Sequence, residues 1–269
     1  MKSASNQHTK AIVLAILGVL ILALGLFGSF STAAAAQAEN ATDSQKMSFS
    51  LSLIGSVVGF ILVVTALVQM KPSSLRKKKT NVHTLALASL FAALCYIGFT
   101  FFKIDIPVGS EKTAFHLGNV FCVLAALLLG GFWGGMAGAV GMTIADLTTA
   151  YVTSAPKTFV LKLCIGLIVG LVANRCFHLD KETNYKRFTI GTVVSCIAGM
   201  AFNVVADPVV GFFYKTYVLG VPQEAAKIWA KMGAVTTLVN AVIAVITASV
   251  LYLALRPALK RAGLLQKIQ

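Results

Sequence analysis

Three polar residues interrupt three consecutive apolar segments between Phe115 and Gly170: Asn119, Asp146 and Lys162. An ionisable side chain at the centre of a bilayer helix costs about 2.5–3.5 kcal/mol on insertion scales, so such residues usually face a protein interior or a watery cavity. An amide, a carboxylate and an ammonium group can hold a ligand by hydrogen bonds and charge. No GxSxG, HExxH or paired catalytic acid motif accompanies them, so the pattern predicts a binding site and not an enzyme.

Further polar residues fall at a similar depth in two later apolar segments. Asn203 and Asp207 are four residues apart and therefore share a helix face, and Asn240 lies one turn from Thr236. His116 stands at the same mouth, while Tyr151 and Phe159 border the cluster and can stack on a planar ring. The predicted substrate-binding residues are His116, Asn119, Asp146, Tyr151, Phe159, Lys162, Asn203, Asp207 and Asn240.

Two interpretations of this cluster remain open. The first is a polar pocket that opens to the outside. The second is a buried network that only fastens helices, with Asp146 or Asp207 paired to Lys162. Polar contacts between membrane helices average about 0.6 kcal/mol, which favours the pocket. Two carboxylates and one ammonium leave a net negative charge, which favours a ligand with an amine or a protonated ring nitrogen.

The composition predicts an all-α polytopic membrane protein. The chain has 269 residues, of which 57% are hydrophobic and 12% charged. Soluble domains average about 25% charged residues. The net charge of +14 fits basic cytoplasmic loops better than nucleic-acid binding. The five cysteines show no metal-ligand spacing, and without a GxxxxGK[ST] motif the chain has no such route to ATP.

The chain divides at a basic linker, KPSSLRKKKT (71–80). Residues 1–78 form an extension with two predicted spans, about 11–30 and 49–70, of which the first also resembles a signal peptide cleaved after Ala38. Residues 79–262 form a six-span core, and 263–269 a cytoplasmic tail. The core spans are expected at about 82–102, 116–130, 132–150, 158–175, 188–214 and 233–255. A reversal is expected over 130–135, and the loop 104–115 is either a lid or a plain connection.

The distribution of basic residues predicts the orientation. With the amino terminus inside, the inner segments carry fifteen Lys and Arg residues and the outer segments carry seven. Basic residues accumulate on the cytoplasmic side, so both termini are expected in the cytoplasm of a multi-pass plasma-membrane protein. The polar cluster then lies in the outer half of the bilayer.

Several stretches carry a family resemblance: HLGNVF (116–121), LLLGGFWGGMAGAVG (127–141), ADLTTAYVTSAPKTFVLK (145–162), and the glycines Gly166 and Gly170. On these, residues 81–262 resemble a substrate-binding S component of an energy-coupling factor (ECF) vitamin transporter, most closely the riboflavin-type branch. Related branches are associated with pyridoxine-type and hydroxymethylpyrimidine-type substrates.

The resemblance implies capture of a water-soluble vitamin or precursor at the outer face, and release inside after the subunit topples in the membrane. The implied partners are a transmembrane T component and two ATPase subunits, which use the ATP, so this chain is expected to bind no cofactor or metal. The family's AxxxA contact with the T component matches Ala88 and Ala92. An alternative function is an ion-coupled secondary transporter that uses Asp146, Lys162 and Asp207 as a proton relay.

Overall fold

The computed structural model describes residues 82–109 and 111–261, together with a few isolated positions before residue 52. The chain forms two compact units, residues 1–79 and 80–269, and the fold described below is that of the second. The two predicted amino-terminal spans, the cleavage after Ala38 and the tail 263–269 lie outside the described residues.

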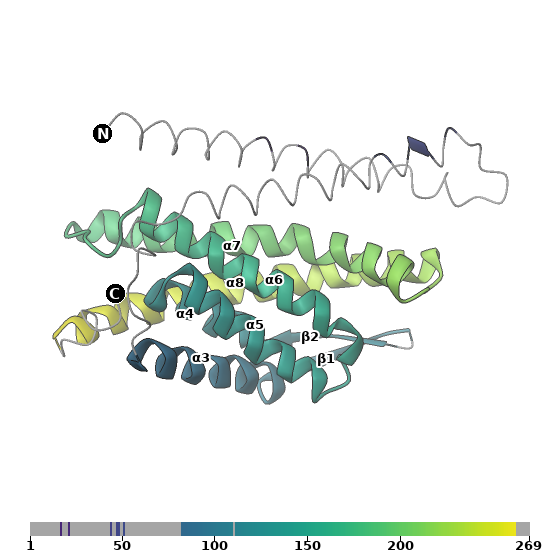
Figure 1. The fold of residues 1–269 in the computed structure, drawn as a ribbon, viewed down its shortest axis with the longest axis horizontal. Coiled ribbons are helices and arrows are strands. Elements are labelled where there is room, and N and C mark those ends of the chain that lie inside the picture. Colours follow the sequence, from purple (N-terminus) through teal and green to yellow (C-terminus); the bar gives the residue numbers. More distant parts are fainter. Residues whose placement is uncertain are drawn as a thin grey trace. The chain divides into compact units, whose positions relative to one another are not determined.

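Six α-helices and one two-stranded hairpin make up residues 82–261 as described (Figure 1). The helices are α3 (Val82–Thr100), α4 (Gly118–Leu129), α5 (Gly131–Leu147), α6 (Ala155–Leu171), α7 (Tyr185–Phe213) and α8 (Gln223–Arg261). Three single turns extend two of them: η2 (Val152–Ser154) precedes α6, while η3 (Val172–Cys176) and η4 (Tyr214–Val218) follow α6 and α7 as π-helical turns. The prediction of an all-α polytopic membrane protein is confirmed, and each expected core span coincides with a helix.

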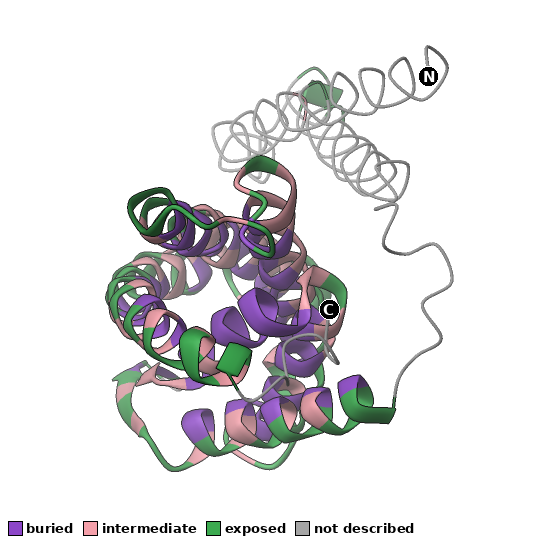
Figure 2. Cartoon of the chain, turned by 90° about the vertical axis from the view of Figure 1, so that its left-hand side faces the viewer, coloured by how far each residue is buried: buried purple, intermediate pink, exposed green. Residues whose placement is uncertain are grey.

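Four helical stretches in the described part of the chain are long and apolar enough to cross a membrane: 82–100, 152–176, 185–218 and 223–261. The other two helices are shorter, and α4 has only 12 residues, or about 18 Å of rise. Every residue of α4 except Phe121 is buried, because α3, α5, α6 and α8 surround it. Figure 2 shows the same arrangement, with the buried residues on the inward faces of the helices.

Glycines bring the central helices into close contact. The reversal expected over 130–135 is a single residue, Gly130, whose φ of 86° suits glycine because a side chain would be strained there. A methyl group at Gly166 would overlap the backbone of Gly135, and one at Gly170 would overlap Gly131. Helices α5 and α6 therefore touch backbone to backbone, as small residues allow in membrane proteins.

The loop 104–115 is an antiparallel hairpin of β1 (Lys103–Val108) and β2 (Glu111–His116), with Lys103 opposite His116. The hairpin lies at one end of the helix bundle, and the start of α3 and the end of α8 lie at the other (Figure 1). At that other end, Asn184 caps α7 by accepting hydrogen bonds from two backbone amides. Arg256 of α8 there donates to the carbonyls of Leu179 and Asp180, which fastens the connection between α6 and α7.

Candidate ligand-binding cavity

A cavity of about 100 Å³ lies where the hairpin meets the helices. Residues from α3, β2 and each of the helices α4 to α8 line it, so segments far apart in sequence converge on one space. Eight of the nine predicted binding residues are among the lining: His116, Asn119, Asp146, Tyr151, Lys162, Asn203, Asp207 and Asn240.

Phe159 is the ninth, and it is not among the residues that line the cavity. The part of α6 that faces the space consists of Ser154, Lys157, Thr158, Leu161 and Lys162. At 3.6 residues per turn these positions form one arc of the helix, and Phe159 falls outside that arc. Proximity in sequence to the polar cluster was therefore misleading at this position.

The deepest polar contact joins α6 to the buried helix α4. The Nζ of Lys162 donates to Oδ1 of Asn119 over 2.9 Å, and the two residues are 7% and 2% exposed. Asn119 is an amide and brings no negative charge. The sequence left open a pairing of Lys162 with Asp146 or Asp207; instead, the hydrogen-bond partner of this ammonium group is neutral.

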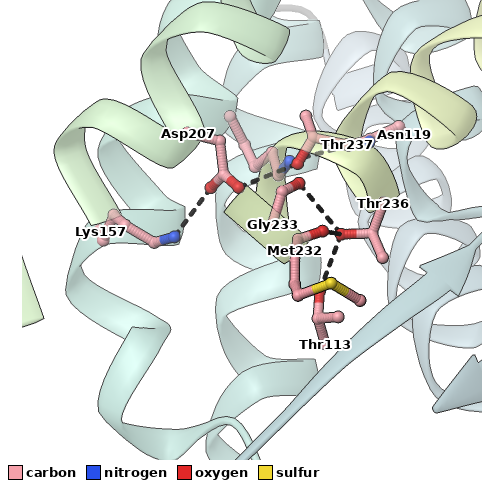
Figure 3. Close-up of polar contacts among 9 residues, drawn as sticks. Thr113, Asn119, Lys157, Asp207, Met232, Gly233, Thr236 and Thr237 are labelled. Carbon is pink, nitrogen blue, oxygen red and sulfur yellow. Dashed lines mark hydrogen bonds and ion pairs between the residues drawn. The ribbon is translucent and has the colours of Figure 1, made fainter. Parts of the chain in front are cut away.

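Asp207 pairs with a different lysine, at the wall between α6 and α7 (Figure 3). The Nζ of Lys157 lies 2.8 Å from Asp207 Oδ1, and Thr237 of α8 donates to Oδ2 over 3.0 Å. Both carboxylate oxygens therefore have partners, and three helices meet at this side chain.

Asn240 fastens the hairpin to α8. Its Nδ2 donates to the carbonyl of Ala114 over 3.0 Å, and its Oδ1 accepts from the backbone amide of His116 over 2.9 Å. The side-chain amide thus pairs with β2 much as a neighbouring strand would. Thr236, one turn away, shares a 2.9 Å hydrogen bond with Thr113 of β2, as Figure 3 shows. Asn240 and Thr236 therefore position the hairpin over the cavity.

Tyr151 fastens the hairpin on the opposite side. Its hydroxyl donates to Asp105 Oδ1 of β1 over 2.8 Å. Burial and the neighbouring Asp105 raise the pKa of Tyr151, so the phenol keeps its proton and remains a donor. The ring also meets Phe99 edge to face at a centroid separation of 5.5 Å, and Phe99 lies 4.6 Å from the ring of His116. These three rings form an apolar border beneath the strands.

Four buried polar atoms in the cavity lining have no hydrogen-bond partner: His116 Nδ1, Asp146 Oδ2, Asn203 Oδ1 and Trp229 Nε1. They come from β2, α5, α7 and α8. A buried polar group without a partner costs about 1–3 kcal/mol, and folded proteins leave few of them. Their convergence on one space makes the cavity a candidate site for a ligand with complementary polar groups.

The charge of the lining differs from the expectation. Six ionisable side chains other than histidine and tyrosine contribute: the lysines Lys112, Lys157, Lys162 and Lys215 and the aspartates Asp146 and Asp207. Four positive and two negative charges give a net +2 when all are ionised. The predicted cluster counted only Lys162 among these lysines, because Lys112, Lys157 and Lys215 were not recognised as lining residues. The preference for an amine ligand stays a prediction.

No group of three His, Cys, Asp or Glu side chains among the described residues is placed to hold a metal ion. The lining therefore offers hydrogen bonds, charge and aromatic surface.

Comparison with known proteins gives a match that spans the helical core of the chain. The family model of the ECF-type riboflavin transporter S component matches residues 79–257, which is more than half of the chain. The chain belongs to this family. A protein of Pyrococcus woesei, described only as an uncharacterized protein, is 32% identical over 122 residues, which cover 45% of this chain and 72% of that protein. No solved structure matches. The family is one of transporter subunits and not of enzymes.

In this S component the small residues predicted to contact a partner face inward. Ala88 is 6% exposed within the core, and the backbone of Ala92 packs against Gly141 of α5. Ala88 and Ala92 thus make contacts within the chain, and their predicted contact with a T component stays a prediction. The small residues that α3 leaves exposed are Ala86, Ser89 and Ala93.

Several lining residues of the S component were not found from sequence. Lys157, Lys215 and Trp229 line the cavity but were not among the predicted binding residues. A signal existed for Trp229, since it precedes Asn240 by eleven residues, or three helical turns, on the same face. Thr158 precedes Lys162 by one turn in the same way. Lys215 also had a signal, because it follows Asp207 by eight residues and the lining residue Gly211 by four.

Proposed function

We propose that this chain is the S subunit of an ECF-type importer that captures a water-soluble vitamin or precursor in the cavity beneath the hairpin. Candidate ligands are riboflavin and compounds of the pyridoxine or hydroxymethylpyrimidine type. A T component and two ATPase subunits use ATP to drive uptake. The supporting observation is the set of four partnerless polar atoms, on His116, Asp146, Asn203 and Trp229, around one cavity.

Each of these atoms can form a hydrogen bond with a particular kind of ligand group. The indole Nε1 of Trp229 can only donate, so it requires an acceptor. The free oxygens of Asp146 and Asn203 accept, and Nδ1 of His116 can do either. A heterocycle with polar substituents offers donors and acceptors at its edge and an apolar face for the rings of Phe99, His116 and Tyr151. Small-molecule sites combine apolar walls and a few convergent polar groups in this way.

The alternative proton relay through Asp146, Lys162 and Asp207 receives less support from the contacts. Lys162 donates to Asn119, whereas Asp207 is held by Lys157 and Thr237. The three groups are not joined in a chain of hydrogen bonds. Uptake by vesicles that contain this chain alone, abolished by an uncoupler, would favour the relay over the importer.

Ligand binding can be tested on the purified chain without ATP. A vitamin panel screened by thermal shift, with mass spectrometry of any compound that co-purifies, is expected to identify a small ring compound that raises the melting temperature. Asp146→Asn and Asn203→Ala should each weaken binding by roughly tenfold, since each removes an acceptor for the ligand. Asp180→Asn is the matched control, because Asp180 is an exposed carboxylate at the far end of the bundle. Absence of stabilisation by every compound would contradict the proposal.

The proposed orientation places the hairpin and the cavity mouth at the outer surface and both termini in the cytoplasm. Cys176 is exposed and lies beyond α6, at the end away from the hairpin. A membrane-impermeant maleimide should therefore label it in inverted vesicles and not in intact cells. In Cys176→Ser combined with Glu224→Cys, which moves the thiol to the exposed start of α8, the labelling pattern should reverse. Labelling of Cys176 in intact cells would refute this orientation.

A further inference from the structure

Four of the charged side chains around the cavity form two opposite pairs. Lys157 lies 2.8 Å from Asp207, so the members of this pair are in direct contact. Lys162 and Asp146, which are 7% and 2% exposed, interact electrostatically. However, Nζ of Lys162 donates to Asn119, and Oδ2 of Asp146 has no hydrogen-bond partner. The charges of Lys162 and Asp146 therefore balance without a hydrogen bond between Nζ and Oδ2.

The two remaining lysines of the lining do not alter this balance. Lys112 is exposed, so water can solvate its ammonium group. Lys215 is buried but already has partners in the structure, and one of them is the ring of Trp229, whose centroid lies 3.9 Å from Nζ. Neither lysine therefore leaves a buried charge that the ligand has to neutralise.

The lining offers the ligand both acceptors and donors. Oδ2 of Asp146 and Oδ1 of Asn203 are acceptors without partners, and Nε1 of Trp229 is a donor without a partner. Lys162 adds donors, because its bond to Asn119 uses one of the three N–H groups of an ammonium. A carboxylate on the ligand would offer acceptors only and would meet Asp146 with like charge. An ammonium would offer donors only and would meet Lys162 with like charge.

The volume of the cavity limits the size of the ligand. The space measures about 100 Å³. An engineered apolar cavity of roughly 150 Å³ in another protein holds one benzene molecule, whereas drug-sized ligands occupy pockets of about 300–1,000 Å³. The cavity therefore fits one ring with small substituents better than a fused system of several rings.

Charge, hydrogen bonding and volume point to one class of ligand. We propose that the ligand is an uncharged heterocycle of one ring, and that a donor and an acceptor on its edge bridge Asp146 and Lys162. The donor, an N–H or O–H group, binds the carboxylate, and the acceptor, an unprotonated ring nitrogen or an oxygen, binds the ammonium. This inference rests on the proposed function, because it specifies the ligand class of the same site. It favours ligands of the hydroxymethylpyrimidine and pyridoxine types over the three-ring riboflavin.

Two series of compounds test the inference by calorimetry on the purified full chain. The first contains the aminopyrimidine with a hydroxymethyl group, its derivative with a dimethylated ring amino group, and its phosphate. The second contains pyridoxine, its derivative with a methylated ring hydroxyl, and its phosphate. In the series whose ring fits, the unmodified compound should bind at least about tenfold more tightly than both derivatives and than riboflavin. Methylation removes the donor, and the phosphate brings a negative charge towards Asp146.

Variants assign the two contacts to Asp146 and Lys162. Asp146→Ala should bind the unmodified and the methylated compound equally, because the group that distinguishes them has lost its partner. Lys162→Met leaves the charge of Asp146 unopposed, so it should shift the preference by about tenfold towards the cationic analogue in which aminomethyl replaces hydroxymethyl. Asp180→Ala, at an exposed position at the other end of the bundle, is the control and should leave these affinities unchanged.

The outcomes separate this inference from the proposed function. If riboflavin binds most tightly, or if a methylated or phosphorylated derivative binds as tightly as its parent compound, the inference is wrong and the proposed function stands. If no compound in either series binds and riboflavin does not bind, the proposed function fails and the inference fails with it. If the variants do not fold, the comparison of compounds on the unmodified chain still decides between these results.

Discussion

The ammonium group of Lys157 lies 2.8 Å from Asp207, and the side chains are 12% and 24% exposed. Lys157→Met leaves a largely buried carboxylate that keeps its hydrogen bond from Thr237 but loses its counter-ion, so it should lower the free energy of unfolding by about 1–3 kcal/mol. Lys157→Met combined with Asp207→Asn should recover part of this loss, because no unpaired charge remains. Melting temperatures in detergent measure both. A double variant whose loss equals the sum of the single losses would show that the pair is not coupled.

His116 should make the fold sensitive to mild acid. Burial, followed by the positive charge of Lys162, lowers the pKa of His116 to about 3 from its usual 6.5, while Asp207 opposes and Lys103 adds to this effect. The unfolded chain therefore takes up a proton below pH 6.5 that the folded chain refuses, so stability present above pH 6.5 is lost as the pH falls towards 3.

Unfolding midpoints in denaturant between pH 7.5 and 5 measure this dependence. His116→Gln should flatten the slope by up to about one proton. His83→Gln, at an exposed position at the start of α3, is the control and should retain it. An unchanged slope in His116→Gln would show that this imidazole is protonated in the folded protein.

The contact between α5 and α6 should not tolerate even one methyl group. Gly166→Ala would push a Cβ into the backbone of Gly135, which cannot move aside as a side chain can. We expect a loss of about 1–3 kcal/mol in stability. Gly233→Ala in α8 is the matched control, because a Cβ there meets nothing within 4 Å and alanine favours the helix. Equal melting temperatures for the two variants would argue against this contact.

Removal of the Tyr151 hydroxyl should loosen the hairpin. Tyr151→Phe keeps the ring against Phe99 and loses the 2.8 Å hydrogen bond to Asp105. Amide hydrogen exchange in β1 should accelerate by roughly tenfold, and bound ligand should dissociate faster. Tyr185→Phe, at a 73% exposed tyrosine, is the control. Unchanged exchange in β1 would mean that the contacts of Thr236 and Asn240 hold the hairpin alone.

The location of the cavity could be predicted from the sequence because amide and ionisable side chains are rare in apolar spans and are therefore conspicuous. Asn119, Asp146, Lys162 and Asn203 stood out for this reason, and all four line one space. Helix periodicity placed Asp207 on the face of Asn203. The hydrogen-bond and ion-pair partners of these residues could not be predicted. They depend on how each helix is rotated relative to its neighbours, and residue spacing within one helix does not reveal that rotation.

Two features needed the structure for physical reasons. The alternation of Ile104, Ile106 and Val108 with more polar residues is the period of a strand, but a six-residue segment between two long helices reads equally well as a loop. Ala88 and Ala92 satisfy the spacing for close helix contact, yet that spacing does not tell whether the neighbouring helix belongs to the same chain. For Ala92 that neighbour is Gly141 of α5.

The backbone contact at Gly135 and Gly166 also has a mechanical consequence. Where two helices meet without side chains between them, no rotamer change can absorb a relative displacement, so α5 and α6 move together as one stiff body. One wall of the cavity is then effectively immobile. If the cavity widens to admit a ligand, the hairpin, α7 and α8 must move. Side-chain hydrogen bonds hold these elements in place, and each of those bonds can break separately.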